Sequence, residues 1–293
     1  MEASGRTSAI LKWSRRVRWM LMLAVLAYLA VCGYVWATQG KKIYEPSVLL
    51  QTTPDRLGMR HEQFTLPSGT GAERGELYTW WIPAERAGAS TLLYLHGNKR
   101  NIAHLIDHTR NLHDAGYNLL IPDYRGYGKS TGGKPTEAKM YEDAEAAWNH
   151  LLQQRHHDPR RIFIYGHSMG GVVGIDLALR HPEAAGLIVE SAFTSMRVMA
   201  QAEHPWLPVD LLLNQRFDAL AKVGKLKLPV LFIHGTWDAR TPYQMSQQLY
   251  EMAPQPKTLK LIEGGEHDNS SSIGLLEYRA AFNAFTLRHA ATP

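Results

Sequence analysis

Three residues of the types that together perform nucleophilic catalysis each follow a short apolar run of this chain. Ser168 is at the centre of the sequence GHSMG (166–170), Asp238 ends HGTWD (234–238), and His267 ends GGEH (264–267). A serine hydroxyl becomes a strong nucleophile when a histidine accepts its proton and a carboxylate orients that histidine. We therefore expect Ser168 to be the nucleophile, His267 the general base and Asp238 the orienting acid. The neighbours of His267, Glu266 and Asp268, are second-choice acids.

The sequence around Ser168 predicts a tight turn between a strand and a helix. The apolar run RIFIY (161–165) precedes the turn, and the small-residue run GVVGIDLA (171–178) follows it. The flanking glycines tolerate unusual backbone angles and let strand and helix approach closely. A Gly-x-Ser-x-Gly sequence found in isolation is explained equally well by an ordinary glycine-rich turn without a catalytic serine. The strand-turn-helix context and the two partner residues favour a catalytic serine.

An attacked carbonyl develops negative charge, so its oxygen needs two hydrogen-bond donors. One expected donor is the N–H of Met169, at the start of the helix, where the helix dipole also favours negative charge. The other is the N–H of Asn98 in the loop after residues 91–95, with Lys99 as the alternative. Gly97 allows this loop to fold back toward Ser168.

Apolar runs and helix-compatible stretches alternate along the chain. Residues 61–66 and 76–82 predict a β-hairpin, and residues 91–95, 117–122, 162–165, 187–190, 230–233 and 259–263 predict further strands. Helices are expected at 101–115, 136–154, 169–181 and 272–290. Short apolar strands separated by helices predict a mostly parallel, doubly wound α/β sheet flanked by helices, whose site lies at the carboxyl ends of its strands.

The segment 193–228 is longer than a simple crossover between strands. It contains PWLP (205–208) and LLL (211–213), which favour a small apolar cap over the site. Ordinary packing of helices against the sheet is the alternative interpretation.

The N-terminal part predicts a membrane anchor. Residues 19–37 carry no charge, and as a helix they span about 28 Å, close to the hydrocarbon thickness of a bilayer. Three arginines in 15–18 precede this run, which favours a cytoplasmic N-terminus and a catalytic domain on the non-cytoplasmic side. We therefore expect a basic cytoplasmic segment (1–18), a transmembrane signal anchor (19–38), a linker (39–60) and a catalytic domain (61–293). A secretory signal cleaved near Ala37 and a lipoprotein signal ending at Cys32 are the alternatives.

Charge and composition exclude other classes of function. Residues 1–42 hold seven basic residues and one acid, so they carry +6, and the remaining residues carry −1 of the net +5. The domain itself is nearly neutral, so we expect no nucleic-acid partner. His104 and His108 have the spacing of metal ligands on a helix, but without a third ligand in the sequence they predict a solvated helix face. We expect no cofactor and no metal.

Five motifs together resemble the α/β-hydrolase superfamily: LHGN (95–98), DYRGYG (123–128), GHSMG (166–170), HGTWD (234–238) and GEH (265–267). More narrowly, residues 60–290 are similar to membrane-anchored α/β-hydrolase domain proteins. The resemblance implies an α/β-hydrolase fold and a triad of Ser168, Asp238 and His267. Its relatives include lysophospholipases, acyl-protein thioesterases and carboxylesterases. Asp123 and Arg125 are expected to hold a tight turn through local hydrogen bonds and an ion pair.

These observations predict a membrane-anchored serine hydrolase. It would cleave carboxylic esters or thioesters through an acyl-enzyme intermediate, with a small-molecule or lipid-like acyl substrate. The alternatives are a serine peptidase on the same fold and a non-catalytic scaffold tethered to the membrane. The sequence names no protein partner.

Overall fold

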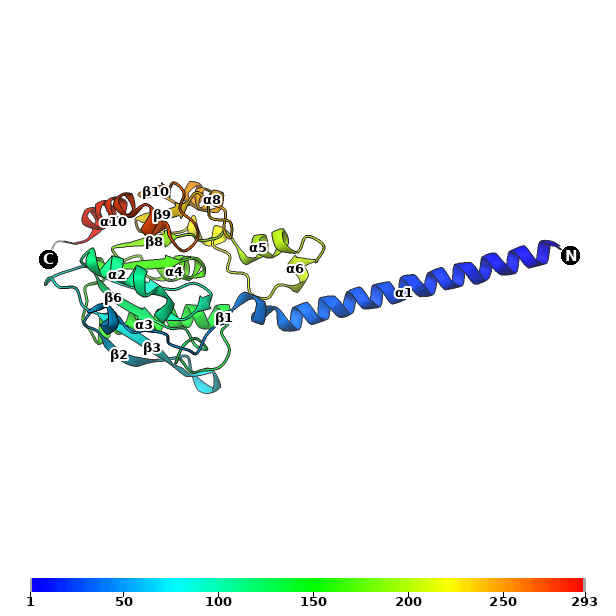
Figure 1. Ribbon diagram of the computed structural model, residues 1–293, viewed down its shortest axis with the longest axis horizontal. Coiled ribbons are helices and arrows are strands. Elements are labelled where there is room, and N and C mark those ends of the chain that lie inside the picture. Colours follow the sequence, from blue (N-terminus) through cyan, green and yellow to red (C-terminus); the bar gives the residue numbers. More distant parts are fainter. Residues whose placement is uncertain (1, 292–293) are drawn as a thin grey trace.

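The computed structural model describes the backbone of residues 2–291 and the side chains of Trp13 and of residues 15–291. A compact domain is joined to one long helix, α1 (Glu2–Ile43), which projects far beyond it (Figure 1). The chain after α1 enters the domain, and the C-terminal helix α10 lies on the side of the domain remote from α1.

An eight-stranded sheet forms the centre of the domain, in the order β10-β9-β8-β7-β4-β6-β3-β2. The pairs among β10, β9, β8, β7, β4 and β6 are parallel, whereas β3 is antiparallel to both β6 and β2. The strands are β2 (Glu62–Ser68), β3 (Gly75–Ile82), β4 (Thr91–Leu95), β6 (Asn118–Pro122), β7 (Ile162–His167), β8 (Gly186–Glu190), β9 (Val230–Gly235) and β10 (Lys257–Ile262). This is the mostly parallel, doubly wound sheet that the alternation of runs predicts.

Apolar runs form these central strands because both faces of the sheet are covered. Successive side chains of a strand point to opposite faces, and here they enter two separate cores. Leu93, Ile164 and Val189 belong to one core, and their neighbours Leu92, Phe163 and Ile188 belong to the other. Because neither face of these strands is exposed to water, their sequences are continuous apolar segments.

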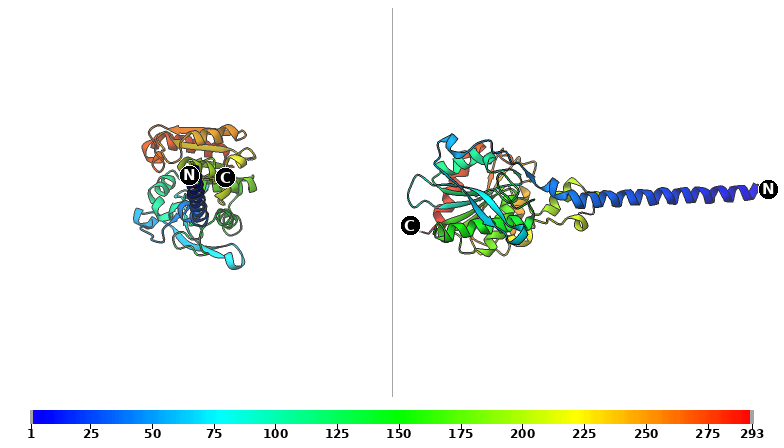
Figure 2. Two further views of the ribbon diagram at one scale, coloured as in Figure 1. Left: turned by 90° about the vertical axis from the view of Figure 1, so that its right-hand side faces the viewer. Right: turned by 90° about the horizontal axis from the view of Figure 1, so that it is seen from below.

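Helices cover the two faces of the sheet. The first core includes residues of α3 (Glu137–Gln153), α4 (Met169–Arg180), α7 (Leu220–Val223) and α8 (Gln244–Met252). The second includes residues of α2 (Ile106–Asp114) and α10 (Leu275–His289). Two short helices, α5 (Met196–Glu203) and α6 (Val209–Leu212), lie beside the domain end of α1 in both Figure 1 and Figure 2.

Most expected elements are present with shifted ends. The expected helix over 101–115 is a 3₁₀ turn, Ile102–Leu105, followed by α2. Thr136 caps α3, since its hydroxyl accepts a hydrogen bond from the Lys139 N–H at 3.2 Å. The final helix is interrupted at Gly274. The short helix α9 (Ser270–Ile273) ends just before this glycine, and α10 begins just after it.

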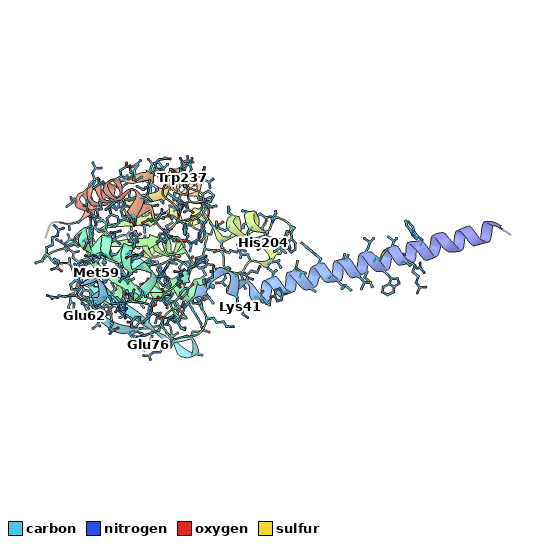
Figure 3. All side chains as sticks on the ribbon, viewed as in Figure 1. Lys41, Met59, Glu62, Glu76, His204 and Trp237 are labelled. Carbon is cyan, nitrogen blue, oxygen red and sulfur yellow. The ribbon has the colours of Figure 1, made fainter. Side chains whose placement is uncertain are left out.

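The segment between the apolar helix and the domain is more ordered than a free linker. The helix α1 continues through Ile43, and Tyr44 is buried against the domain. The short strand β1 (Glu45–Pro46) then pairs in parallel with β5 (Lys99–Arg100). The chain leaving α1 is thus attached directly to the loop that carries Asn98. Lys41 marks this junction in Figure 3.

The DYRGYG turn is held as the sequence predicts, with a different acid as the ion-pair partner of its arginine. The Arg125 guanidinium is buried and lies 2.6 Å from the Asp143 carboxylate and 2.6 Å from that of Glu142. Asp123 instead accepts the backbone N–H of Ile102 at 2.9 Å. The Asp123 contact attaches the turn to the segment that follows the loop after β4, and the Arg125 contacts attach it to α3.

Candidate active site

Ser168 occupies a strained turn between β7 and α4. Its backbone angles are φ 55° and ψ −121°, in a region that residues with side chains rarely adopt. Such a conformation costs on the order of 1–3 kcal/mol and persists where surrounding contacts hold it. Here the Ser168 N–H donates to the Glu190 carbonyl at 2.8 Å, and its own carbonyl accepts from the Gly171 N–H at 2.9 Å. The turn therefore presents the hydroxyl above the carboxyl end of the sheet.

The glycines of the GHSMG motif are required by close packing. A Cβ at Gly166 would overlap the backbone of Gly170, and a Cβ at Gly170 would overlap the Leu95 carbonyl of the neighbouring strand β4. Gly97 lies against the serine itself, because a Cβ there would come within 3.3 Å of the Ser168 Cβ. Gly166 and Gly170 therefore allow the tight turn itself and its approach to β4, whereas a side chain at Gly97 would require Ser168 to shift slightly.

The structure brings the three sequence-predicted residues into one hydrogen-bonded chain. His267 Nε2 is 3.0 Å from Ser168 Oγ, and His267 Nδ1 is 2.7 Å from Asp238 Oδ2. All three are buried, with 7%, 8% and 5% of the surface of Ser168, His267 and Asp238 exposed. The residues come from loops after β7, β10 and β9, so the parallel sheet gathers groups that are up to 99 residues apart in the chain.

Asp238 receives more hydrogen bonds than its role beside His267 requires. Its Oδ1 accepts the backbone N–H groups of Arg240 and Thr241, each at 2.9 Å. Its Oδ2 faces the Thr241 hydroxyl at 2.8 Å and His234 Nε2 at 3.1 Å, in addition to His267. Burial alone would raise the pKa of Asp238, but the hydrogen bonds from His234 and His267 outweigh it and hold the pKa well below its usual range. The carboxylate therefore stays ionised.

The surroundings of His267 suit the role of base that the sequence predicts. Burial lowers its pKa below the ordinary value, and the hydrogen bond to Asp238 partly offsets that effect. A neutral imidazole that donates its Nδ1–H to a carboxylate must carry its lone pair on Nε2. That lone pair faces the Ser168 hydroxyl, as proton abstraction requires.

The two expected oxyanion donors border the same space. Met169 is the first residue of α4, and the first N–H groups of a helix have no partner within the helix. The backbone of Asn98 is held in place, since its carbonyl accepts from the Glu45 N–H at 3.0 Å and the Tyr127 hydroxyl at 2.9 Å. Asn98, its alternative Lys99 and Met169 line the cavity that also contains Ser168.

Two residues of the site were missed by sequence reasoning. His234 shares its Nε2 proton between Asp238 and the Thr241 carbonyl, which is 2.7 Å away, and its Nδ1 is 2.7 Å from the Ser246 hydroxyl. The Thr241 hydroxyl lies 3.1 Å from His267 Nδ1. The sequence contains a signal for both His234 and Thr241. His234 is in the HGTWD motif, and an aspartate commonly bonds the backbone amides two or three residues later.

Other candidate residues lie outside the chain of three. Asp268 is half-exposed and pairs with Arg240 at 3.1 Å, and Glu266 is exposed. The expectation of a solvated face is wrong for His108. Its ring is largely buried against Tyr94 and Tyr278, with hydrogen bonds of 2.8 and 3.1 Å, and burial lowers its pKa to about 4.

One group of side chains in the described part of the chain has the spacing of metal ligands. His167, His267 and Asp268 place a ligand atom each within 4.8 Å of one another. Both ring nitrogens of His267 already face Ser168 and Asp238, and His167 Nε2 donates to the His267 carbonyl at 2.9 Å. A metal ion here would have to break those hydrogen bonds, so we assign the group to the triad and its support.

A cavity of about 710 Å³ opens above Ser168. Residues of the cap segment 193–228 form much of its wall, and their side chains are mostly apolar: Phe193, Met196, Met199, Leu207, Leu212 and Leu213. The last turns of α1 contribute Val35, Gln39, Lys41 and Lys42. The remaining charged residues of the wall are Glu45, Lys99, Glu203 and Arg240. The part of the wall that the cap segment forms is suited to an apolar chain.

Comparison with known proteins decides the family. The profile of the family described as "Serine aminopeptidase, S33" matches residues 88–217 and 211–270. The chain belongs to this family of α/β-hydrolases. An uncharacterised protein of Mycobacterium tuberculosis (strain ATCC 25618 / H37Rv) is 30% identical over 273 residues, which cover 92% of this chain and 94% of that protein. The α/β-hydrolase domain-containing protein WAV2 of Arabidopsis thaliana is 30% identical over 238 residues, 74% of this chain and 76% of that protein.

Solved structures agree on the fold. The esterase Pf2001 of Pyrococcus furiosus superposes with a TM-score of 0.71 and 21% identity, covering 85% of this chain and 98% of that one. At this level of identity the likeness establishes the α/β-hydrolase fold. Membership of the hydrolase family supports an enzymatic function for this α/β-hydrolase.

Proposed function

We propose that this protein is a serine hydrolase that cleaves carboxylic ester or thioester bonds through an acyl-enzyme intermediate. The observation that carries the proposal is the chain of hydrogen bonds from Ser168 Oγ to His267 Nε2 (3.0 Å) and from His267 Nδ1 to Asp238 Oδ2 (2.7 Å), with Ser168 and His267 lining a cavity that has a largely apolar wall. An ionised Asp238 and a neutral His267 are the protonation states that this reaction needs.

The reaction proceeds in two halves. Ser168 Oγ attacks the carbonyl carbon while its proton moves to His267 Nε2, and the C=O π bond becomes an oxyanion. The oxyanion re-forms the carbonyl, the bond to the alcohol or thiol breaks, and His267 returns the proton to that leaving group. Water then attacks the acyl-enzyme by the same route. It releases the carboxylic acid and restores the Ser168 hydroxyl.

The oxyanion would be held by the N–H groups of Asn98 and Met169. Both border the cavity beside Ser168, and the start of α4 adds the favourable end of a helix dipole. Removing one such donor from a hydrolase costs about 10²–10³ in kcat.

The cavity favours an acyl group over a peptide N-terminus. An aminopeptidase must pair the ammonium group of its substrate with a carboxylate. The acids on the cavity wall are Glu45 and Glu203, whose side chains are 51% and 78% exposed, and Glu45 is already 3.5 Å from Lys99. The residues that the cap segment contributes to the wall are mostly apolar. A serine peptidase on the same fold is therefore the second candidate, supported by the name of the family.

We further propose that α1 is a retained single-pass anchor with a cytoplasmic N-terminus and an extracytoplasmic domain. Residues 15–43 form a helix long and apolar enough to cross a membrane, and 6% of its most apolar window is buried. Cleavage near Ala37 would remove Tyr28, Cys32 and Val35, which pack against the cap. Protease treatment of sealed inverted vesicles tests the orientation. The domain should be protected there, and its digestion would contradict the proposed side.

Hydrolysis of p-nitrophenyl esters of increasing acyl length tests the reaction and the pocket. We expect turnover that depends on Ser168, loss of turnover in Ser168→Ala, and the highest kcat/KM for acyl chains long enough to reach the cap. p-Nitroanilides of the same acyl groups distinguish the peptidase alternative. Equal rates for Ser168→Ala and the unmodified protein would exclude the proposed mechanism and favour the non-catalytic scaffold.

A further inference from the structure

Residues 196–213 of the cap segment form the cap proper, which is attached along the side of α1. Near the domain, Gln39 Nε2 donates to the Leu212 carbonyl at 2.9 Å, and Gln39 Oε1 accepts the Asn214 N–H at 3.0 Å. Further along the helix, Cys32 is buried against Leu207 and Val209. These contacts make the cap and the helix one packed unit.

The tip of the cap reaches far along the helix. The Tyr28 hydroxyl donates to the Trp206 carbonyl at 3.1 Å, and the two rings are 6.4 Å apart at their centroids. Gln39 and Tyr28 are separated by eleven residues, which is about 16 Å of α-helix. The position of the cap beside α1 is visible in Figure 1, and Figure 3 marks His204 on the cap and Lys41 at the domain end of α1.

This contact places the tip at the level of the apolar part of α1. Tyr28 is at the middle of the uncharged run 19–37, whereas Lys41 and Lys42 lie at its domain end, where basic residues meet lipid headgroups. If residues 19–37 occupy the hydrocarbon layer, the part of the cap that touches Tyr28 must lie beyond the headgroups as well. The helix cannot span the bilayer while the tip of the cap remains in water.

The surface of the cap suits that position. Leu211 is 83% exposed and Trp206 is 56% exposed, and they extend the exposed apolar surface of α1. Two of the charged side chains of the cap form an ion pair, Arg197 with Asp210. Pairing lowers the cost of removing these two charges from water. The Glu203 side chain is 78% exposed, and Glu203 also borders the active-site cavity.

We infer that the cap is inserted in the bilayer leaflet beside α1, and that the active-site cavity receives its acyl chain directly from that leaflet. The second half of the inference rests on the proposed hydrolase function. It follows because the cavity wall is shared by α1, which contributes Val35, and the inserted cap, which contributes Leu207. The substrate class is then an ester of a bilayer-resident acyl lipid.

The test of insertion uses the full chain in lipid bilayers and needs no catalysis. In a Cys32→Ala, Ser168→Ala background, a nitroxide is attached at Leu211→Cys or, as a control, at Leu276→Cys. Both leucines are 83% exposed, and Leu276 is on α10 on the sheet face away from the cap. We expect the label at position 211 to be accessible to oxygen and shielded from a water-soluble nickel complex, and the label at 276 to show the reverse. Water-like accessibility at both sites would overturn the inference. Dipolar broadening between labels at position 211, without access of oxygen, would also overturn it, because the cap would then contact a second copy of the chain instead of lipid.

A second experiment tests the route of the substrate. Leu211→Glu should lower hydrolysis of a long-chain ester held in vesicles by about tenfold or more, because a charge replaces an apolar side chain in the leaflet. Hydrolysis of water-soluble p-nitrophenyl acetate should be unchanged, and Leu276→Glu should change neither rate. Equal loss on both substrates would contradict the route. Absence of all ester hydrolysis in the unmodified protein would refute the proposed function while leaving the insertion result standing.

Discussion

Replacing Asp238 with asparagine keeps the size of the side chain and removes its charge. The structure determines how the new amide must turn. Two backbone N–H groups, of Arg240 and Thr241, point at the Oδ1 position at 2.9 Å and cannot rotate away. The other donors that face Oδ2 have alternative acceptors, since His234 Nε2 also faces the Thr241 carbonyl at 2.7 Å and the Thr241 hydroxyl faces the Ser191 carbonyl at 3.0 Å. We therefore expect the amide oxygen to accept the two backbone N–H groups and the NH₂ group to occupy the Oδ2 position that faces His267 Nδ1 at 2.7 Å.

That orientation places the imidazole proton on the wrong nitrogen. His267 Nδ1 would accept from the amide, and the proton would then be on Nε2, pointing at Ser168 Oγ. The base would have no lone pair for the serine proton. Loss of the correct tautomer in a serine triad lowers kcat by about 10⁴-fold, which corresponds to about 5.5 kcal/mol of transition-state stabilisation.

The assay is kcat and KM for a short-chain p-nitrophenyl ester with the Asp238→Asn protein. We expect the loss to fall on kcat, with KM within about threefold, because Asp238 contacts His267 rather than the substrate space. Asp268→Asn is the matched control, and it should retain nearly full activity. Thermal unfolding of both variants checks that the domain is folded. A folded Asp238→Asn protein that keeps more than a tenth of the normal kcat would refute the tautomer argument.

Two further predictions concern pH and stability. The acid limb of the kcat/KM profile should have its midpoint below about 6.5, because burial lowers the pKa of His267 and activity is lost only as pH falls through that pKa; a midpoint above 7 would contradict this. Arg125→Ala should destabilise the domain by about 3–5 kcal/mol in urea unfolding, since it leaves the buried Asp143 carboxylate without its partner. Arg160→Ala removes an exposed ion pair and should leave the urea unfolding midpoint nearly unchanged; equal effects of the two substitutions would contradict the structural role of Arg125.

The central strands were predictable because they are buried on both faces and therefore read as continuous apolar runs. The ends of elements were less predictable. The break between α9 and α10 depends on the packing of Gly274, where a Cβ would overlap the Ile262 side chain. Such a contact between distant segments leaves no periodic signal in the sequence.

The proximity of Ser168, Asp238 and His267 was predictable because each follows its own strand and parallel strands end at one edge of the sheet. The hydrogen bonds from the Arg240 and Thr241 amides to Asp238 follow a common local pattern. The approach of His234 and of the Thr241 hydroxyl to Asp238 was less predictable, since it depends on how the loop 236–241 folds. His108 is another residue whose surroundings could not be predicted from the sequence. Its spacing from His104 indicates a helix face, but only the tertiary structure shows that Tyr94 and Tyr278 cover it. The contact of the cap with α1 is likewise a property of the folded chain alone.

The most direct test of the account is where a fluorophosphonate reacts. The unmodified protein is treated with the probe, and peptide mass spectrometry locates the adduct. We predict one adduct on Ser168, none on Ser168→Ala, and labelling slowed by several orders of magnitude in His267→Ala, because the hydroxyl then has no base. An unlabelled native protein, or labelling that continues unchanged in Ser168→Ala, would contradict the assignment of Ser168 as the nucleophile.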